Sequence, residues 1–246
     1  AYEPTHDQWA AYKKKMKRKG LSATAIKAFG YNFAKLTSGD SLVIPETAID
    51  TVAELPAYES INYEQPELLR KTVVLKLNGG LGTGMGLEKA KSLLPIREGA
   101  TFLDFIARQV THMRDSLGVP VAFMLMNSFA TSKDTLAALE SYPSLQSRSL
   151  PLEFVQNTAP KVTASDLSPA AWPANPAHEW CPPGHGDLYA ALAGSGTLDK
   201  LLGQGYEYMF VSNSDNLGAT LDVKLRTWFA KSKAPFAMEG CQRTDA

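Results

Sequence analysis

The densest cluster of glycines in the chain follows directly on an apolar run. Five glycines fall between Gly79 and Gly86, in the stretch "KLNGGLGTGMGLEKAKS". Backbone N–H groups that carry no Cβ nearby can form a concave anion site, and they let a base or phosphate approach the main chain. Each glycine also costs conformational entropy on folding. We therefore predict a loop that binds a phosphorylated ligand; the alternative is a glycine-rich turn that binds nothing.

Two familiar phosphate-binding patterns do not fit this loop. The dinucleotide pattern G-x-G-x-x-G fails, because no glycine of the loop has partners both two and five residues onward. The P-loop pattern fails because Ala90 stands where its second glycine would be. Lys91 follows the loop, where an ammonium group could neutralise the charge that develops in phosphoryl or nucleotidyl transfer. Lys89 competes for this role, and composition alone does not choose between them.

Other candidates follow the next two apolar runs. Met126 lies at the end of "VPVAFMLMN", where it could contact a flat base or belong to the core. Gln156 ends the run "LEFVQN", and its amide could read the edge of a pyrimidine, although a surface glutamine is the simpler interpretation.

The segment "CPPGHGDLYAAL" places His185 between Gly184 and Gly186. Two prolines stiffen the approach, and Asp187 stands at a favourable N-cap position for a helix. Of the four histidines, His185 is the one with this setting. We predict that it binds ligand; the alternative is an ordinary core or surface histidine.

The segment "FVSNSDNLGAT" ends another apolar run with Asn213, Asp215 and Asn216. A carboxylate directly after a buried strand could hold Mg²⁺ against a triphosphate, because this cation prefers oxygen ligands and keeps several waters. The alternative is an Asx-type turn.

Short apolar strands alternate with helical patterns from residue 71 onward. We predict strands at 72–77, 119–127, 152–157, 206–213 and 234–240, with helices around 102–117, 131–142 and 187–202. This alternation predicts a doubly wound α/β sheet. Ligands bind such sheets beyond the carboxyl ends of the strands, where the candidate residues above are found.

The first 70 residues have a different pattern. Trp9, Tyr12 and Met16 predict one amphipathic helix, and Ser22 is expected to cap a second helix that carries Ile26 and Phe33. Residues 37–71 are expected to form an extended wrap. We therefore divide the chain into a helical N-terminal segment with its wrap, 1–70, and the first part of a nucleotide-binding α/β domain, 71–246.

Composition excludes several classes of protein. The 246 residues carry 25 basic and 25 acidic side chains, so no global field would gather nucleic acid or an anionic membrane. The basic run "KKKMKRK" is better explained as a solvated helix face. No apolar stretch approaches the roughly 20 residues of a membrane span. Cys181 and Cys241 lack metal-type spacing, which indicates a reducing, cytoplasmic setting.

Taken together, "LNGGLGTGMG" with Lys91, "PPGHGD" and "MFVSNSDNLGAT" resemble the UDP-glucose pyrophosphorylase (UTP–glucose-1-phosphate uridylyltransferase) family. The resemblance is to the eukaryotic type, and especially the kinetoplastid branch. A looser match at 38–61 extends it over nearly the whole chain. It implies a Rossmann-like mixed sheet of the GT-A-like nucleotidyltransferase type. It also implies an enzyme that forms UDP-glucose and pyrophosphate from UTP and glucose 1-phosphate with Mg²⁺.

The resemblance also implies roles for individual residues. Lys91 and Asp215 would be catalytic, with Asp215 as the metal ligand. The remaining contacts fall into two groups. The nucleotide would be bound by Leu77, Asn78, Gly79, Gly80, Lys91, Met126, Gln156, Gly184 and Asp215; the sugar phosphate would be bound by Gly79, His185, Asn213, Ser214 and Asp215.

Members of that family are roughly twice as long as this chain. We therefore expect a chain cut off partway through the fold, lacking the rest of the sugar pocket and a C-terminal β-helix domain, with the missing half possible as a separate chain. Two alternatives stay open at this stage. One is a UDP-N-acetylhexosamine or broad-specificity UDP-sugar pyrophosphorylase; the other is a catalytically silent nucleotide-binding fragment.

Overall fold

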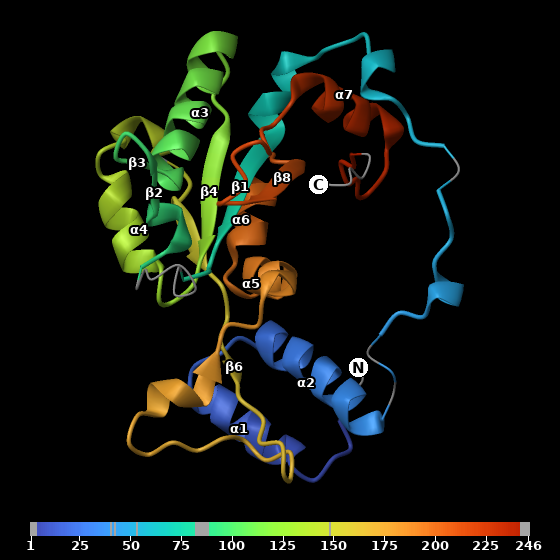
Figure 1. Ribbon diagram of the computed structural model, residues 1–246, viewed down its shortest axis with the longest axis vertical. Helices are drawn as coiled ribbons and strands as arrows, with labels where there is room; N and C mark the ends of the chain where they lie inside the picture. The colour runs from blue at the N-terminus through green and yellow to red at the C-terminus, as the bar shows by residue number, and fades with distance from the viewer. Residues whose placement is uncertain are drawn as a thin grey trace.

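A four-stranded parallel sheet forms the centre of the molecule (Figure 1). The computed structural model describes residues 4–39, 41, 43–52, 54–81, 89–147 and 149–241. The strands run in the order β5-β4-β1-β8, and every neighbouring pair is parallel. Their bounds are β1 (Thr72–Asn78), β4 (Ala122–Asn127), β5 (Glu153–Val155) and β8 (Tyr208–Asn213). The predictions of these four strands are confirmed.

A mixed sheet was expected, with both parallel and antiparallel strands. In the described residues the central sheet is parallel throughout, and antiparallel pairing occurs in two small separate sheets. One pairs β2 (Pro95–Arg97) with β3 (Ala100–Thr101), and the other pairs β6 (Ala159–Pro160) with β7 (Trp180–Cys181).

Helices cover both faces of the central sheet, which confirms the doubly wound architecture (Figure 1). On one face, Val74 and Phe123 pack with α3 (Phe102–Leu117) and α4 (Ser132–Leu139). On the other, Val73 and Leu75 pack with α5 (Leu188–Gly194) and α6 (Thr197–Gly203). Successive side chains of a strand point to opposite faces, so the continuous apolar run of β1 supplies both cores.

Helix ends follow local sequence signals. α3 begins at a capping box in which Thr101 and Asp104 each bond the backbone N–H of the other. Its predicted bounds are confirmed. The single helix predicted over 187–202 is instead two helices, because Gly196 adopts a φ of +74° and turns the chain between α5 and α6.

The N-terminal helices are α1 (Trp9–Arg18) and α2 (Ala23–Ser38). Ser22 caps α2 by accepting the Ala25 N–H at 3.1 Å, as predicted. The apolar faces meet in a cluster of Trp9, Tyr12, Met16, Ile26 and Phe33. The described residues of 39–71 form an extended wrap with short 3₁₀ turns at Glu46–Ala48, Tyr58–Ser60 and Pro66–Lys71.

The C-terminal part differs from prediction. A helix that was not predicted from the sequence, α7 (Val223–Ser232), follows β8. The strand predicted over 234–240 is wrong: this segment forms no strand, and Phe236 and Met238 are 64% and 80% exposed. A strand needs a hydrogen-bonded neighbour. Lys233, with a φ of +57°, ends α7, and the described chain that follows does not return to the sheet.

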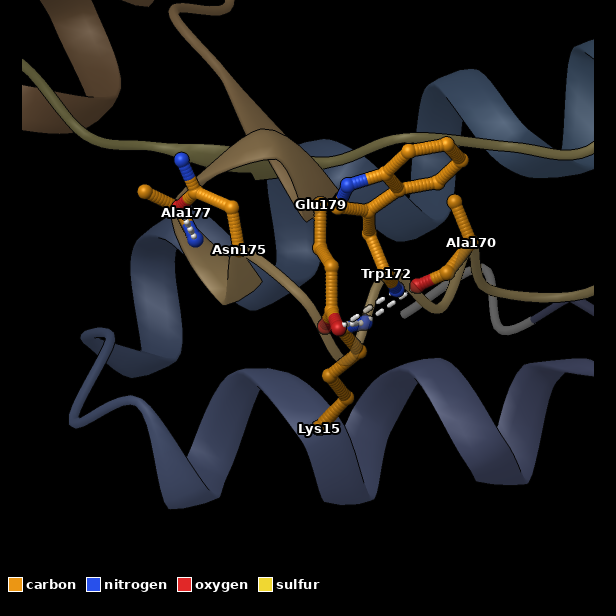
Figure 2. Close-up of polar contacts among 6 residues, drawn as sticks. All are labelled: Lys15, Ala170, Trp172, Asn175, Ala177 and Glu179. Carbon is orange, nitrogen blue, oxygen red and sulfur yellow. Dashed lines mark hydrogen bonds and ion pairs between the residues drawn. The ribbon is translucent and has the colours of Figure 1, made fainter.

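The segment between β5 and α5 leaves the sheet and packs on the N-terminal helices (Figure 1). Tyr12 donates to the Leu167 carbonyl, and Lys15 of α1 forms an ion pair with Glu179. Figure 2 shows this pair, with Lys15 also donating to Ala170 O and the other Glu179 oxygen accepting from the Trp172 N–H. The division at residue 70 stays a prediction; in space, residues 159–181 lie with α1 and α2.

Candidate nucleotide-binding site

The candidate site is built where the carboxyl ends of β1, β4 and β8 meet. In the sheet register Leu77 lies opposite Met126 on one side and Asn213 on the other. The Ser214 N–H donates to the Leu77 carbonyl at 3.1 Å. Parallel strands thus bring three of the sequence motifs to one edge, as a doubly wound sheet requires.

The glycine turn begins directly after β1. Gly79 and Gly80 are described, whereas Gly82, Gly84 and Gly86 lie outside the described residues. A Cβ on Gly79 would lie 2.7 Å from the amide nitrogen of Gln156, so any larger residue here would displace that side chain or the turn. Gln156 is buried, and its side chain therefore rests against the main chain of the turn. Among the described residues, a Cβ on Gly80 would meet nothing within 4 Å, so this part of the structure leaves the residue open to a ligand.

Lys91 is held beside this turn by the backbone. Its N–H donates to the Gly80 carbonyl at 3.0 Å, next to an antiparallel bridge between Leu81 and Ala90. Its ammonium group lies 2.6 Å from Oδ2 of Asp215, in a half-buried ion pair. Lys89 is exposed. This geometry favours Lys91 over Lys89 as the lysine of the candidate site.

Asp215 carries its negative charge readily. The hydrogen bond from Lys91 lowers the pKa of the Asp215 carboxyl, against the opposing effect of partial burial. The positive charges of Lys91 and, to a smaller extent, His185 act in the same direction. His185 is thus within electrostatic reach of Asp215, and its ring is exposed.

Asp187 ties the "PPGHGD" segment to the residues that follow β5. It occupies the N-cap position of α5, but its side chain caps nothing there. Instead it accepts the Asn157 N–H at 2.6 Å and the Asn157 amide Nδ2 at 2.9 Å. Burial raises the pKa of the Asp187 carboxyl, and these hydrogen bonds oppose that rise. The contact fixes Gly184 and His185 relative to Gln156.

Two predicted ligand contacts have side chains that face the interior. Met126 is fully buried in the apolar cluster on one face of the sheet, and its contact with a base stays a prediction. The Asn78 side chain is 2% exposed and bonds to Asn127 and Thr135, so only its main chain faces the turn. Asn213 is exposed, whereas Ser214 is buried.

The described protein groups at the candidate site would supply only part of the coordination shell of a Mg²⁺ ion. Among the described residues, no group of three or more histidines, cysteines, aspartates or glutamates gathers in metal-binding geometry. Mg²⁺ commonly takes one or two carboxylates and completes its shell with waters and substrate phosphates. An ionised Asp215 beside the glycine turn fits that pattern.

A buried polar network beneath the turn was not predicted from the sequence. It joins Asn78 to Asn127 and Glu153. The sequence places Asn78 directly after the predicted strand 72–77 and Asn127 at the end of the predicted strand 119–127, but it does not show that the two are neighbours.

A separate open groove of about 630 Å³ lies between α1 and residues 176–180. Lys14, Arg18 and Lys19 line it together with Trp180. None of the predicted ligand-binding residues lines this groove. No helix in the described part of the chain combines the length and the apolar character that crossing a membrane requires.

Comparison with known proteins assigns the family. The family model of UTP–glucose-1-phosphate uridylyltransferase matches residues 28–246. The chain belongs to this family. The uridylyltransferase of Solanum tuberosum is 41% identical over 210 residues, which are 85% of this chain and 42% of that protein. That of Saccharomyces cerevisiae is 43% identical over 197 residues, 78% of this chain and 39% of that protein.

Solved structures of the family agree. A mutant UDP-glucose pyrophosphorylase from Leishmania major in complex with UDP-glucose has a TM-score of 0.91 and 47% identity, covering 97% of this chain and 50% of that one. The chain therefore spans about half the length of the relatives that it matches. The resemblance seen in the sequence is confirmed at the level of family and fold.

Proposed function

We propose that this protein acts as a UTP–glucose-1-phosphate uridylyltransferase. An oxygen of the phosphate of glucose 1-phosphate attacks the α-phosphorus of UTP and forms a new P–O bond. The bond from that phosphorus to the β-phosphate oxygen breaks, and pyrophosphate leaves with UDP-glucose as the other product. The observation that carries this proposal is the Lys91–Asp215 pair beside the open turn at Gly80.

Lys91 supplies positive charge where negative charge grows. Its ammonium group already pairs with a carboxylate at 2.6 Å, so a phosphate oxygen of similar charge can take that place. A fixed cation at the reacting phosphate stabilises the transition state more than the ground state, which lowers the barrier. No covalent enzyme intermediate is needed, since direct in-line displacement suffices.

The main chain from Leu77 to Gly80 cradles the uridine phosphate in this proposal. Gln156 and Gly184 read the uracil edge, because a buried amide carries both a donor and an acceptor. Asn213 and His185 contact the sugar phosphate, and alignment of the two substrates is the main contribution of these residues.

Asp215 would hold the Mg²⁺. The ion would supply further neutralisation of the phosphates when bound. The carboxylate oxygen that Lys91 does not take is available to it.

The proposal is tested by calorimetry with UTP and with UDP-glucose, together with an assay of pyrophosphate release. Release is measured with glucose 1-phosphate and with other sugar 1-phosphates, with Mg²⁺ and after its removal by a chelator. We expect UTP to bind, and release to require both glucose 1-phosphate and Mg²⁺. Binding without release in the complete gene product would support a silent nucleotide-binding protein, and absence of both would refute the proposal.

A further inference from the structure

A chain of buried side-chain amides runs beneath the glycine turn and ends at one carboxylate. Asn78 Nδ2 donates to Asn127 Oδ1 at 2.6 Å. Asn127 Nδ2 in turn donates to Glu153 Oε2 at 2.6 Å. These residues end β1, end β4 and begin β5, so the chain crosses three neighbouring strands of the sheet.

The network holds both sides of the candidate uracil site. The Asn78 carbonyl, at the start of the turn, accepts from the Thr131 hydroxyl at 2.8 Å. The Asn127 carbonyl accepts the Gln156 N–H at 2.7 Å. Asn127 therefore hydrogen-bonds through its side chain to Asn78, which precedes Gly79. Through its main chain it hydrogen-bonds to Gln156, whose side chain contacts Gly79.

Glu153 fixes the direction of every bond in this chain. An ionised carboxylate can only accept, so Asn127 must turn its NH₂ toward Glu153 and its oxygen toward Asn78. Asn78 must then present its NH₂ to Asn127. The second oxygen of Glu153 accepts from the Ser132 hydroxyl at 2.7 Å, which holds the carboxylate in place.

Burial makes the wrong orientation costly. Asn78 is 2% exposed and Asn127 is fully buried, so a reversed amide would set two like groups against each other with no water to satisfy them. Even in the observed orientation, Asn78 Oδ1 is buried without a hydrogen-bond partner in the described residues. The network therefore has one defined arrangement, imposed by a charge at its end.

We propose that Glu153 and Asn127 are positioning residues for uridine-nucleotide recognition. Neither side chain touches the candidate ligand site. Together they set the orientation of Asn78, and hence of the turn at Gly79, against Gln156. This inference rests on the proposed function, because it assigns uracil recognition to these two elements.

The first test is a set of single variants of the complete gene product. Glu153→Gln removes the charge, so the amides lose their fixed direction; Asn127→Asp places two carboxylates in contact. We expect either change to raise KM for UTP roughly tenfold to a hundredfold, the range of a lost charged hydrogen bond. KM for glucose 1-phosphate should change less than KM for UTP, because of the residues assigned to the sugar phosphate the network adjoins Gly79, whereas on the nucleotide side it adjoins Asn78, Gly79 and Gln156. Glu67→Gln, at an exposed glutamate, is the matched control.

The double variant Glu153→Gln with Asn127→Asp gives the sharper test. The charge then sits in the middle of the chain, at position 127, where the amide of Asn78 and the new amide at position 153 can both donate to it. We expect KM for UTP to return to within about threefold of the unsubstituted value, as a double-mutant cycle with strong coupling requires. Independent damage at two sites would instead add, and that result would overturn the proposal.

A readout that does not depend on the nucleotide separates this inference from the proposed function. Side-chain NH₂ exchange of Asn78 is followed by NMR in the unsubstituted protein, in Glu153→Gln and in the double variant. We expect exchange to accelerate at least about tenfold in Glu153→Gln and to slow again in the double variant. If UTP fails to bind the unsubstituted protein, the proposed function fails, and unchanged amide exchange in Glu153→Gln would separately refute the network.

Discussion

Lys91 and Lys89 are two residues apart, but in the described structure the ion pair with Asp215 comes from Lys91. We predict that Lys91→Ala lowers kcat by about 100-fold to 1,000-fold, the usual cost of removing one fixed charge-stabilising group. UTP affinity should fall much less, because the ammonium acts mainly on charge that develops during transfer. Steady-state kinetics and UTP calorimetry measure the two effects. Lys89→Ala is the control and should retain kcat; equal losses in both variants would remove Lys91 from the mechanism.

Gly79 and Gly80 offer a second matched pair of residues. Ala at position 79 would bring its Cβ to 2.7 Å from Gln156, so the glutamine or the turn must move. Ala at position 80 meets nothing within 4 Å in the described structure. We predict that Gly79→Ala weakens UTP binding about tenfold or more, while Gly80→Ala changes it little unless the ligand itself fills that space. Calorimetry on both variants decides this, and tight binding by Gly79→Ala would contradict the geometry.

Strand β1 carries a buried charge at Lys76, among apolar neighbours that cannot neutralise it. Lys76 is 3% exposed; its ammonium donates to the Ala219 carbonyl at 2.8 Å and lies 5.9 Å from the centre of the Phe210 ring. Burial lowers the pKa of Lys76 to about 8. Because this pKa is depressed in the folded state, the unfolded chain binds the extra proton between pH 8 and the ordinary value of 10.5. The free energy of unfolding therefore rises with pH across that window.

We predict that Lys76→Met removes this rise. The stability of the variant relative to the unsubstituted protein should decrease by about 3 kcal/mol between about pH 7 and pH 10.5, from the depressed pKa. Urea unfolding at a series of pH values measures the difference, with Lys89→Met to account for the loss of a surface charge. A difference that does not depend on pH would show that the pKa of Lys76 is not depressed.

Elements were predictable from sequence where one local signal decides them. The predicted helix around 102–117 matches α3, and the apolar runs predicted β1, β4 and β8, although β4 and β8 begin later than predicted, at Ala122 and Tyr208. The conformation of the segment 234–240 was not predictable from the sequence. Its apolar residues are typical of a strand, but a strand forms only where the tertiary structure places a hydrogen-bonded partner strand beside it. Met126 was ambiguous for a similar reason: the face of β4 on which it lies is decided by the register with β1 and β5. The Glu153 network spans three strands and has no linear motif.

For the whole molecule, the wrap is an exposed connection between the N-terminal helices and the sheet. Val43, Ile44 and Val52 are 74%, 72% and 69% exposed, in chain with little regular structure. We predict that elastase cuts first within 43–57, because exposed irregular chain is the preferred site of nicking. The two products should stay associated, since α1 and α2 are held by the Trp9 cluster and by the Lys15–Glu179 pair.

Limited proteolysis followed by gel filtration tests this. Co-elution of the two fragments is the expected result, and their separation without denaturant would contradict it. Lys15→Met should make the nicked complex easier to dissociate, whereas Lys17→Met, at an exposed lysine of the same helix, is the comparison.

The short ladder between β6 and β7 has one further consequence. Ala159 pairs with Cys181 and Pro160 with Trp180, so the two ends of the segment 161–179 lie side by side. The number of residues in this segment therefore does not determine the distance between Gln156 and His185. Changing the length of the segment between the two strands should therefore leave the distance between Gln156 and His185 unchanged, whereas the contacts of this segment with α1 would be lost.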